Sequence, residues 1–201
     1  LTITQAGSAA FAGRVQINDL ITAADGYTLS LTGDANTFVA AIDILSTGKV
    51  TIGSADSDSS TFNGGLTLVN GDPALDVRGA INSSADAINF GTGTVTLLGD
   101  TTVATNAGGG LSAAGSSITF GGAITGAFDL ALNAGTGGAI ASNGADAAGL
   151  IDITDLTITQ AGSAAFAGRV QINDLITAAD GYTLSLTGDA NTFVAAIDIL
   201  S

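Results

Sequence analysis

Aspartate is the residue type best placed to do chemistry in this sequence. All 18 acidic residues among the 201 are Asp, and the chain contains neither His nor Cys. It therefore offers no nitrogen or sulfur ligand for zinc, haem or an iron–sulfur cluster, and no His base or Cys nucleophile. Carboxylates, hydroxyls and amides remain, and these can bind hard cations or hydrolyse glycosidic bonds. We expect no cofactor, with calcium as the one candidate ion.

The candidate calcium site is the run from Ser54 to Ser60, which gathers hydroxyl and carboxyl side chains around Asp56 and Asp58. Calcium takes about six to eight oxygen ligands, so closely spaced carboxylates and hydroxyls favour it. The run lacks the central Gly and the terminal Glu of an EF-hand, and it does not match the calcium-binding nonapeptide of other β-helices. Two interpretations stay open: a calcium site at Asp56 and Asp58, and a solvated turn.

Two pairs of Asp residues suggest glycoside hydrolysis, namely Asp152 with Asp155 and Asp72 with Asp76. Glycosidases need two carboxyl groups about 5–10 Å apart on either side of the scissile bond. A cleft for a polysaccharide also needs long loops, which the short segments of this chain do not provide. We therefore predict that the chain is not an enzyme and has no catalytic residues.

The charge of the chain excludes several partners. The net charge is −14 at pH 7, with cations only at Arg14, Lys49, Arg78 and Arg169. Nucleic acids and anionic lipids need clustered basic side chains, so neither is expected. No apolar run approaches the roughly 18 residues of a membrane span, so we expect no membrane insertion by this segment. Divalent cations bridging rows of Asp could bundle such chains laterally; the alternative is that the charge only maintains solubility.

An unchanged internal repeat organises the chain. Residues 1–46 recur without a substitution at 156–201, an offset of 155 residues. The chain is thus one complete unit, 1–155, followed by the first part of the next. Identity at polar as well as apolar positions indicates a tandem array.

Within the unit, short segments alternate apolar and polar residues, as in Leu1–Thr4, Tyr27–Leu31 and Leu66–Leu68. This alternation is typical of half-buried strands, and Gly, Asn, Asp and Ser separate the segments. Phe recurs about every 26 residues, which divides the unit into about six turns. Turns of this length bury their apolar sides by stacking as a parallel β-helix, whereas an array of antiparallel sandwiches is the rival fold. One internal stack is then expected from Phe11, Phe38, Phe62, Phe90, Phe120, Ile140, Phe166 and Phe193.

The Gly-rich run from Ile118 to Gly138 and the segment Leu156-Thr157-Ile158-Thr159 resemble the repeats of filamentous-haemagglutinin-like and autotransporter-type bacterial surface proteins. The resemblance implies a right-handed parallel β-helix, secretion to the cell surface and a stalk or adhesive role. We therefore expect an all-β structural segment of a long extracellular fibre that associates with itself along its axis. The copies are either covalent tandem repeats or chains stacked end to end. A polysaccharide-binding or polysaccharide-cleaving β-helix is the alternative function.

Overall fold

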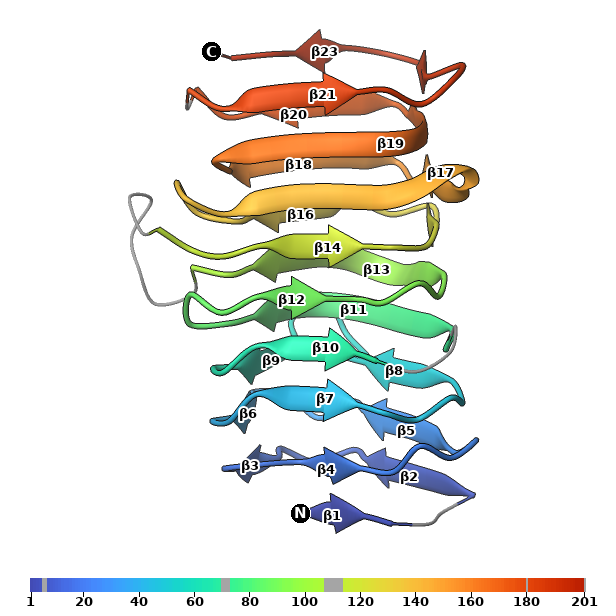
Figure 1. The fold of residues 1–201 in the computed structure, drawn as a ribbon, viewed down its shortest axis with the longest axis vertical. Helices are drawn as coiled ribbons and strands as arrows, with labels where there is room; N and C mark the ends of the chain where they lie inside the picture. The colour runs from blue at the N-terminus through green and yellow to red at the C-terminus, as the bar shows by residue number, and fades with distance from the viewer. Residues whose placement is uncertain (5–6, 70–72, 107–113, 180, 201) are drawn as a thin grey trace.

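The protein is a parallel β-solenoid of about eight turns (Figure 1). The computed structural model describes residues 1–4, 7–69, 73–106, 114–179 and 181–200, with only the backbone for 145–149. The strands nearest the viewer run left to right and those behind run right to left as the chain climbs, which makes the solenoid right-handed. The described residues include no helix, and so none that could cross a membrane. The predicted fold class is confirmed.

Three faces, each a ladder of parallel strands, make up the solenoid. Face I contains β2 (Ser8–Phe11), β5 (Thr28–Leu31), β8 (Val50–Ile52), the starts of β11 (Leu75–Asn82) and β13 (Val95–Ala104), β15 (Ile124–Thr125), the ends of β17 (Ala139–Asp152) and β19 (Ser163–Ile172), and β22 (Thr192–Phe193). Face II contains β3 (Gln16–Ile17), β6 (Asn36–Phe38), β9 (Ser59–Phe62), the ends of β11 and β13, β16 (Leu130–Asn133), β18 (Asp155–Gln160), β20 (Asp174–Thr177) and β23 (Ile197–Asp198). Face III contains β1 (Thr2–Ile3), β4 (Ile21–Thr22), β7 (Ile42–Ile44), β10 (Leu66–Leu68), β12 (Ile88–Asn89), β14 (Ile118–Phe120), the starts of β17 and β19, and β21 (Thr183–Leu186).

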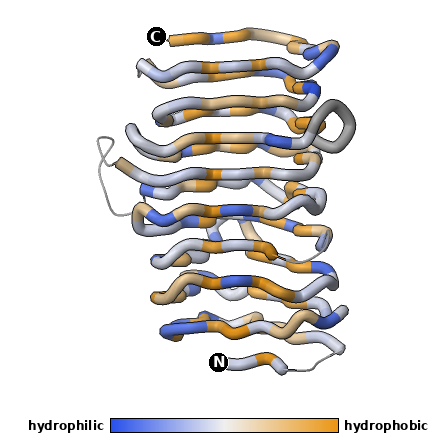
Figure 2. The backbone as a smooth tube through the Cα atoms, in the orientation of Figure 1, coloured by the Kyte–Doolittle hydropathy of each residue, from blue (hydrophilic) through white to orange (hydrophobic). Residues whose placement is uncertain are grey.

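Alternating side chains build the core, because every second residue of a strand points to the same side. On face I, Leu31, Ile52, Val77 and Leu97 lie in register on four successive turns, and all are buried. Figure 2 shows the result as hydrophobic segments that recur at similar places along successive turns. Each added turn therefore extends one continuous apolar core.

A buried Asn fixes the corner between faces I and II. Asn36 Oδ1 accepts the N–H of Val15 on the turn below at 2.8 Å, and its Nδ2 donates to the Gly33 carbonyl at 2.6 Å and to Ser60 Oγ on the turn above at 3.1 Å. The turns approach so closely here that a Cβ on Gly33 would lie 2.2 Å from the carbonyl oxygen of Gly13. The corner therefore admits only Gly at this position.

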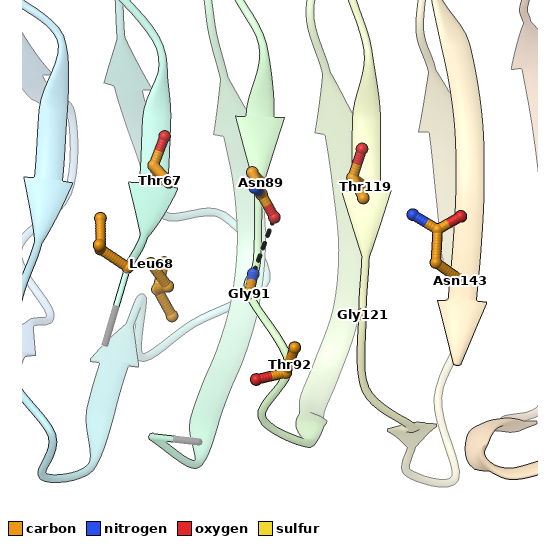
Figure 3. A pocket seen from close by; sticks show the side chains of 9 residues that line it. Thr67, Leu68, Asn89, Gly91, Thr92, Thr119, Gly121 and Asn143 are labelled. Carbon is orange, nitrogen blue, oxygen red and sulfur yellow. Dashed lines mark hydrogen bonds between the residues drawn. The ribbon is translucent and has the colours of Figure 1, made fainter. Parts of the chain in front are cut away.

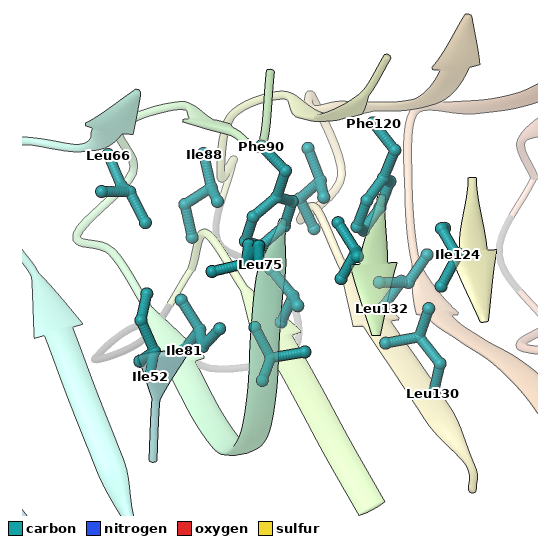
Figure 4. Packing of buried hydrophobic residues seen from close by; sticks show 14 of the residues in the cluster. Ile52, Leu66, Leu75, Ile81, Ile88, Phe90, Phe120, Ile124, Leu130 and Leu132 are labelled. Atoms are coloured by element: carbon teal, nitrogen blue, oxygen red, sulfur yellow. The ribbon is translucent and has the colours of Figure 1, made fainter. Parts of the chain in front are cut away.

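The Phe side chains do not form the single stack that their spacing predicts. They are divided among the faces, with Phe11 and Phe193 on face I, Phe38 and Phe62 on face II, and Phe90, Phe120 and Phe166 on face III. Two pairs stack: the ring centroids of Phe38 and Phe62 are 4.9 Å apart, and those of Phe90 and Phe120 are 4.8 Å apart (Figure 4). The aromatic contacts are thus local to two pairs of turns.

Ile140 does not substitute for Phe in the layer where the sequence places it. The residue in register between Phe120 and Phe166 is the buried Ser142. Ile140 lies two residues earlier, in register with Ile118 below and Ala164 above. It packs in the core, but in the neighbouring row of side chains.

The two identical segments occupy different faces. We call residues 1–46 the first copy and residues 156–201 the second copy. Thr2 lies on face III, whereas its counterpart Thr157 lies on face II. Face III strands run from β1 through β4, β7, β10, β12 and β14 to β17, which is six turns, and two more faces lead to β18. One 155-residue unit thus makes six and two-thirds turns, where the Phe spacing predicts six.

Candidate functional site

Asp58, one of the two predicted calcium ligands, closes its own turn. It is buried, and its Oδ2 accepts three hydrogen bonds: from the N–H of Ser54 at 2.7 Å, from Ser54 Oγ at 2.8 Å and from the N–H of Ala55 at 2.9 Å. Burial alone would raise the pKa of Asp58, but the bonds from Ser54 and Ala55 outweigh it, so the pKa lies below its usual value. The Asp58 carboxylate thus fixes the backbone of the loop at Ser54 and Ala55.

Asp56, the other predicted ligand, pairs with Arg78 on the turn above. Arg78 Nε donates to Asp56 Oδ1 at 2.7 Å, and its Nη2 donates to Oδ2 at 3.3 Å. The hydrogen bond from Arg78 lowers the pKa of Asp56, and the pair lies where a Cβ on Gly99 would collide with both side chains. The two carboxylates thus bond to different groups of the protein, and calcium binding at Asp56 and Asp58 stays a prediction.

Four Asp residues form a column that the sequence reasoning missed. Asp100, Asp129, Asp155 and Asp174 lie at the start of the face II part of their turns, and the residues that follow them are in register on successive turns. Their carboxylates accept N–H bonds from the turn above: Asp100 from Asp129 at 3.2 Å, and Asp155 from Asp174 at 3.1 Å. We call these four residues the aspartate column. The signal available in the sequence was an Asp immediately before an apolar strand.

Like charges and burial affect one member of the column. Burial raises the pKa of Asp129, and the charges of Asp155 and Asp100 raise it further. Beside it lies an open hollow of about 350 Å³, lined in part by Asp56, Asp100 and Asp129. The described residues contain no group of three or more acidic, His or Cys side chains able to hold a metal ion. Lateral bridging by divalent cations therefore remains a prediction about contacts between rods.

Three of the four Asp residues considered for hydrolysis, Asp76, Asp152 and Asp155, lie in the described part of the chain. Asp76 forms an ion pair with Lys49 at 2.5 Å, and Asp72 lies outside the described residues. Asp152 ends β17 on face I, whereas Asp155 begins β18 at the corner to face II, where its carboxylate accepts an N–H bond. Asp76 and Asp155 therefore each have a structural partner, Lys49 and the N–H of Asp174 respectively.

An open groove of about 560 Å³ crosses face III (Figure 3). Outward-facing Thr67, Asn89 and Thr119 stand in register on neighbouring strands, and Asn143 lies beyond them. Asn89 Oδ1 accepts the N–H of Gly91 at 2.9 Å, which ties the side chain to its own turn. The lining is hydroxyl, amide and aliphatic, without a charged side chain. Such a surface suits a neutral, hydroxyl-rich ligand better than an ion.

The two end turns expose apolar side chains. At the upper end of Figure 1, Ile197 and Ile199 on the second copy are 46% and 58% exposed. Their counterparts Ile42 and Ile44 in the first copy are 1% and 0% exposed. Ile197 and Ile199 therefore occupy inward-facing positions with no turn above them in the described residues.

No protein-family model, curated protein or solved structure matches the chain.

Proposed function

We propose that the chain is a structural segment of a long fibre, a β-solenoid built from tandem repeats that lies outside the cell or on its surface. The observation that carries the proposal is the continuation of one solenoid from the first copy into the second. The same 46 residues enter the same rod twice, with the same registers between their own strands. A fold that accepts its own sequence again at the next position can be extended by copy number alone.

The unit is well suited to span distance. At about 4.8 Å per turn, six and two-thirds turns give a rise of about 32 Å per unit. Three units complete 20 turns and bring the same residues back to the same face after about 96 Å. Any surface feature of the unit, such as the aspartate column or the face III groove, is then displayed on all three sides of the rod.

The electrostatics and the resemblance support the location and the mechanical role. The net charge of −14 favours solubility and opposes lateral aggregation of flat strands. The repeats resemble those of large bacterial surface proteins, for which a stalk or adhesive role is expected. No catalytic step is part of the proposal. Asp58 and Asp100 accept backbone N–H bonds, and Asp56 and Asp76 pair with cationic side chains.

The test is the mass of the native material on a denaturing gel, with peptide sequencing of the band. We expect several hundred kilodaltons with these peptides present, and electron micrographs of rods with an axial repeat of about 96 Å. A band near the 19.4 kDa of this chain would contradict a covalent array.

A second candidate function, binding of a neutral polysaccharide, is favoured by the face III groove. Its hydroxyl and amide lining provides the hydrogen-bonding groups that sugars require, although no aromatic side chain lines it. Calorimetric titration with neutral glycans, comparing the native chain with Asn89→Ala, would test it. Equal heats for the two proteins would contradict it.

A further inference from the structure

The upper end turn, residues 183–200, exposes a surface on which no turn of the described residues packs. The first copy shows which residues pack on the equivalent surface. Residues 28–45 have the same sequence and are covered by residues 47–69. There, β8 pairs with β5, β9 with β6 and β10 with β7, all in parallel. Since the two copies differ in no residue, the covering turn alone accounts for the burial of Ile42 and Ile44 and the exposure of Ile197 and Ile199.

The backbone at this end has N–H donors in the positions that bond to the covering turn in the first copy. In the first copy, the N–H of Leu29 donates to the carbonyl of Lys49 at 2.9 Å, and the N–H of Ile42 donates to the carbonyl of Gly65 at 3.1 Å. Leu184 has the same register on the strand beneath it as Leu29. Next to Ile197, Thr177 Oγ1 donates to the carbonyl of Asp198, as Thr22 Oγ1 donates to that of Asp43 in the first copy. The N–H groups of Leu184 and Ile197 therefore point toward the open end. An exposed row of strand donors is a template for pairing with another strand.

We propose that residues 183–200 form a docking surface for another 155-residue unit, which packs its residues 47–69 onto them in parallel register. The inference rests on the proposed function, because the incoming unit supplies the next part of the repeat in the fibre. The pairings are those of the first copy, where Leu31 lies under Ile52, Phe38 under Phe62 and Ile44 under Leu68.

These pairings assign a specific partner to each exposed core residue. Leu186 lies under the incoming Ile52, and Phe193 stacks on the incoming Phe62. Ile197 lies under the incoming Leu66, and Ile199 lies under the incoming Leu68. Val194 is excluded from the interface, because its counterpart Val39 is 54% exposed even though a turn covers the first copy. Val194 therefore provides a matched control for Ile197 on the same turn.

The experiment lengthens the full chain after Ser201 by the sequence of residues 47–69 and measures amide hydrogen exchange. We expect the amides of Leu184 and Ile197 to exchange at least tenfold more slowly than in a chain that carries a scrambled extension of the same composition, because both gain carbonyl acceptors. In the lengthened chain, Ile197→Asn should remove most of this protection, whereas Val194→Asn should retain it.

Equal exchange rates at Leu184 and Ile197 with the native and scrambled extensions would overturn the proposed register. The same protection in both Asn variants would also overturn it, because the docking would then not depend on the inward-facing row. Neither result bears on the mass of the native material. A giant chain with an unprotected junction contradicts only the docking, and a small chain with a protected junction contradicts only the covalent fibre.

Discussion

The first and second copies have one sequence but different neighbouring turns. Near the start of the sequence the second copy is more buried, and near its end the first copy is more buried. Phe166 is 1% exposed, whereas its counterpart Phe11 is only partly buried, because the second copy has turns beneath it. Farther along, the order reverses: Phe38 is fully buried and Phe193 is not, because only the first copy has turns above it. Burial in this fold is therefore a property of the neighbouring turn rather than of the local sequence.

The features that do not differ between the copies show what the 46 residues specify by themselves. Asn191 accepts the N–H of Val170 at 2.9 Å, as Asn36 accepts that of Val15. A Cβ on Gly188 would lie 2.0 Å from the carbonyl oxygen of Gly168, which repeats the close approach at Gly33. The 46 residues therefore determine the turn length and the corner geometry. They do not determine which face each strand joins, since the second copy is displaced by one face.

The largest expected effect comes from truncating Phe at matched positions. Phe166→Ala should lower the free energy of unfolding by about 3–5 kcal/mol, because it opens a cavity between Ser142 and Leu186. Phe11→Ala should cost about 1–2 kcal/mol, because part of its surface already faces water. Urea unfolding followed by circular dichroism measures both.

The second Phe pair is the control, and its order should reverse. Phe38→Ala removes the ring stacked on Phe62 and should cost more than Phe193→Ala. If Phe11→Ala and Phe166→Ala cost the same, the neighbouring turn does not determine burial energy, and the comparison between the copies fails.

A smaller effect is expected at the corner Asn. Asn36→Ala removes a buried side chain that bonds to three turns and leaves the N–H of Val15 without its acceptor, so we expect a loss of about 2–3 kcal/mol. Asn191→Ala removes the equivalent bond to Val170 where no turn lies above, and should cost about 1 kcal/mol. The same urea experiment applies; a greater loss for Asn191→Ala would contradict the role of the covering turn.

The sequence was sufficient to predict a parallel solenoid, but not to assign side chains to faces. The alternation of apolar residues and the repeat depend on local patterns, which the structure preserves. Face assignment depends on the length of each turn, which varies from 19 residues between Thr2 and Ile21 to 30 between Ile88 and Ile118. Phe38 follows Phe11 by 27 residues, but the turn there brings Leu31 above Phe11, so Phe38 falls on the next face.

The candidate site was harder to predict for the same reason. The Asp56–Arg78 pair spans 22 residues, which is one local turn, and it appears only when the register is known. Without the register, the sequence predicts that Asp56 and Asp58 are equivalent ligands of one ion. The aspartate column is also invisible as a spacing, because its members follow turns of unequal length.

The smallest expected effect concerns the acidic side chains beneath the second copy, which have no equivalent in the described residues beneath the first copy. The aspartate column places Asp129 and Asp155 beneath Asp174, whereas its counterpart Asp19 offers its carbonyl to the amino terminus at 2.9 Å. Because partial desolvation and the charges of Asp155 and Asp100 raise the pKa of Asp129, its ionised form destabilises the folded state at neutral pH. The contribution of Asp129 is thus most favourable below its unfolded pKa and is lost as the pH rises through the higher folded pKa.

Asp129→Asn keeps an oxygen acceptor and removes the charge, so we expect a gain of a few tenths of a kcal/mol at pH 7 and low salt. The gain should shrink at high salt and vanish near pH 3, where the native Asp129 is itself protonated. Asp58→Asn is the matched control of opposite sign, because the pKa of Asp58 is lowered and its stabilisation is present above its unfolded pKa and lost on acidification. Thermal unfolding across pH distinguishes the two. Destabilisation by Asp129→Asn at pH 7 would mean that the carboxylate serves the N–H of the turn above more than it repels its neighbours.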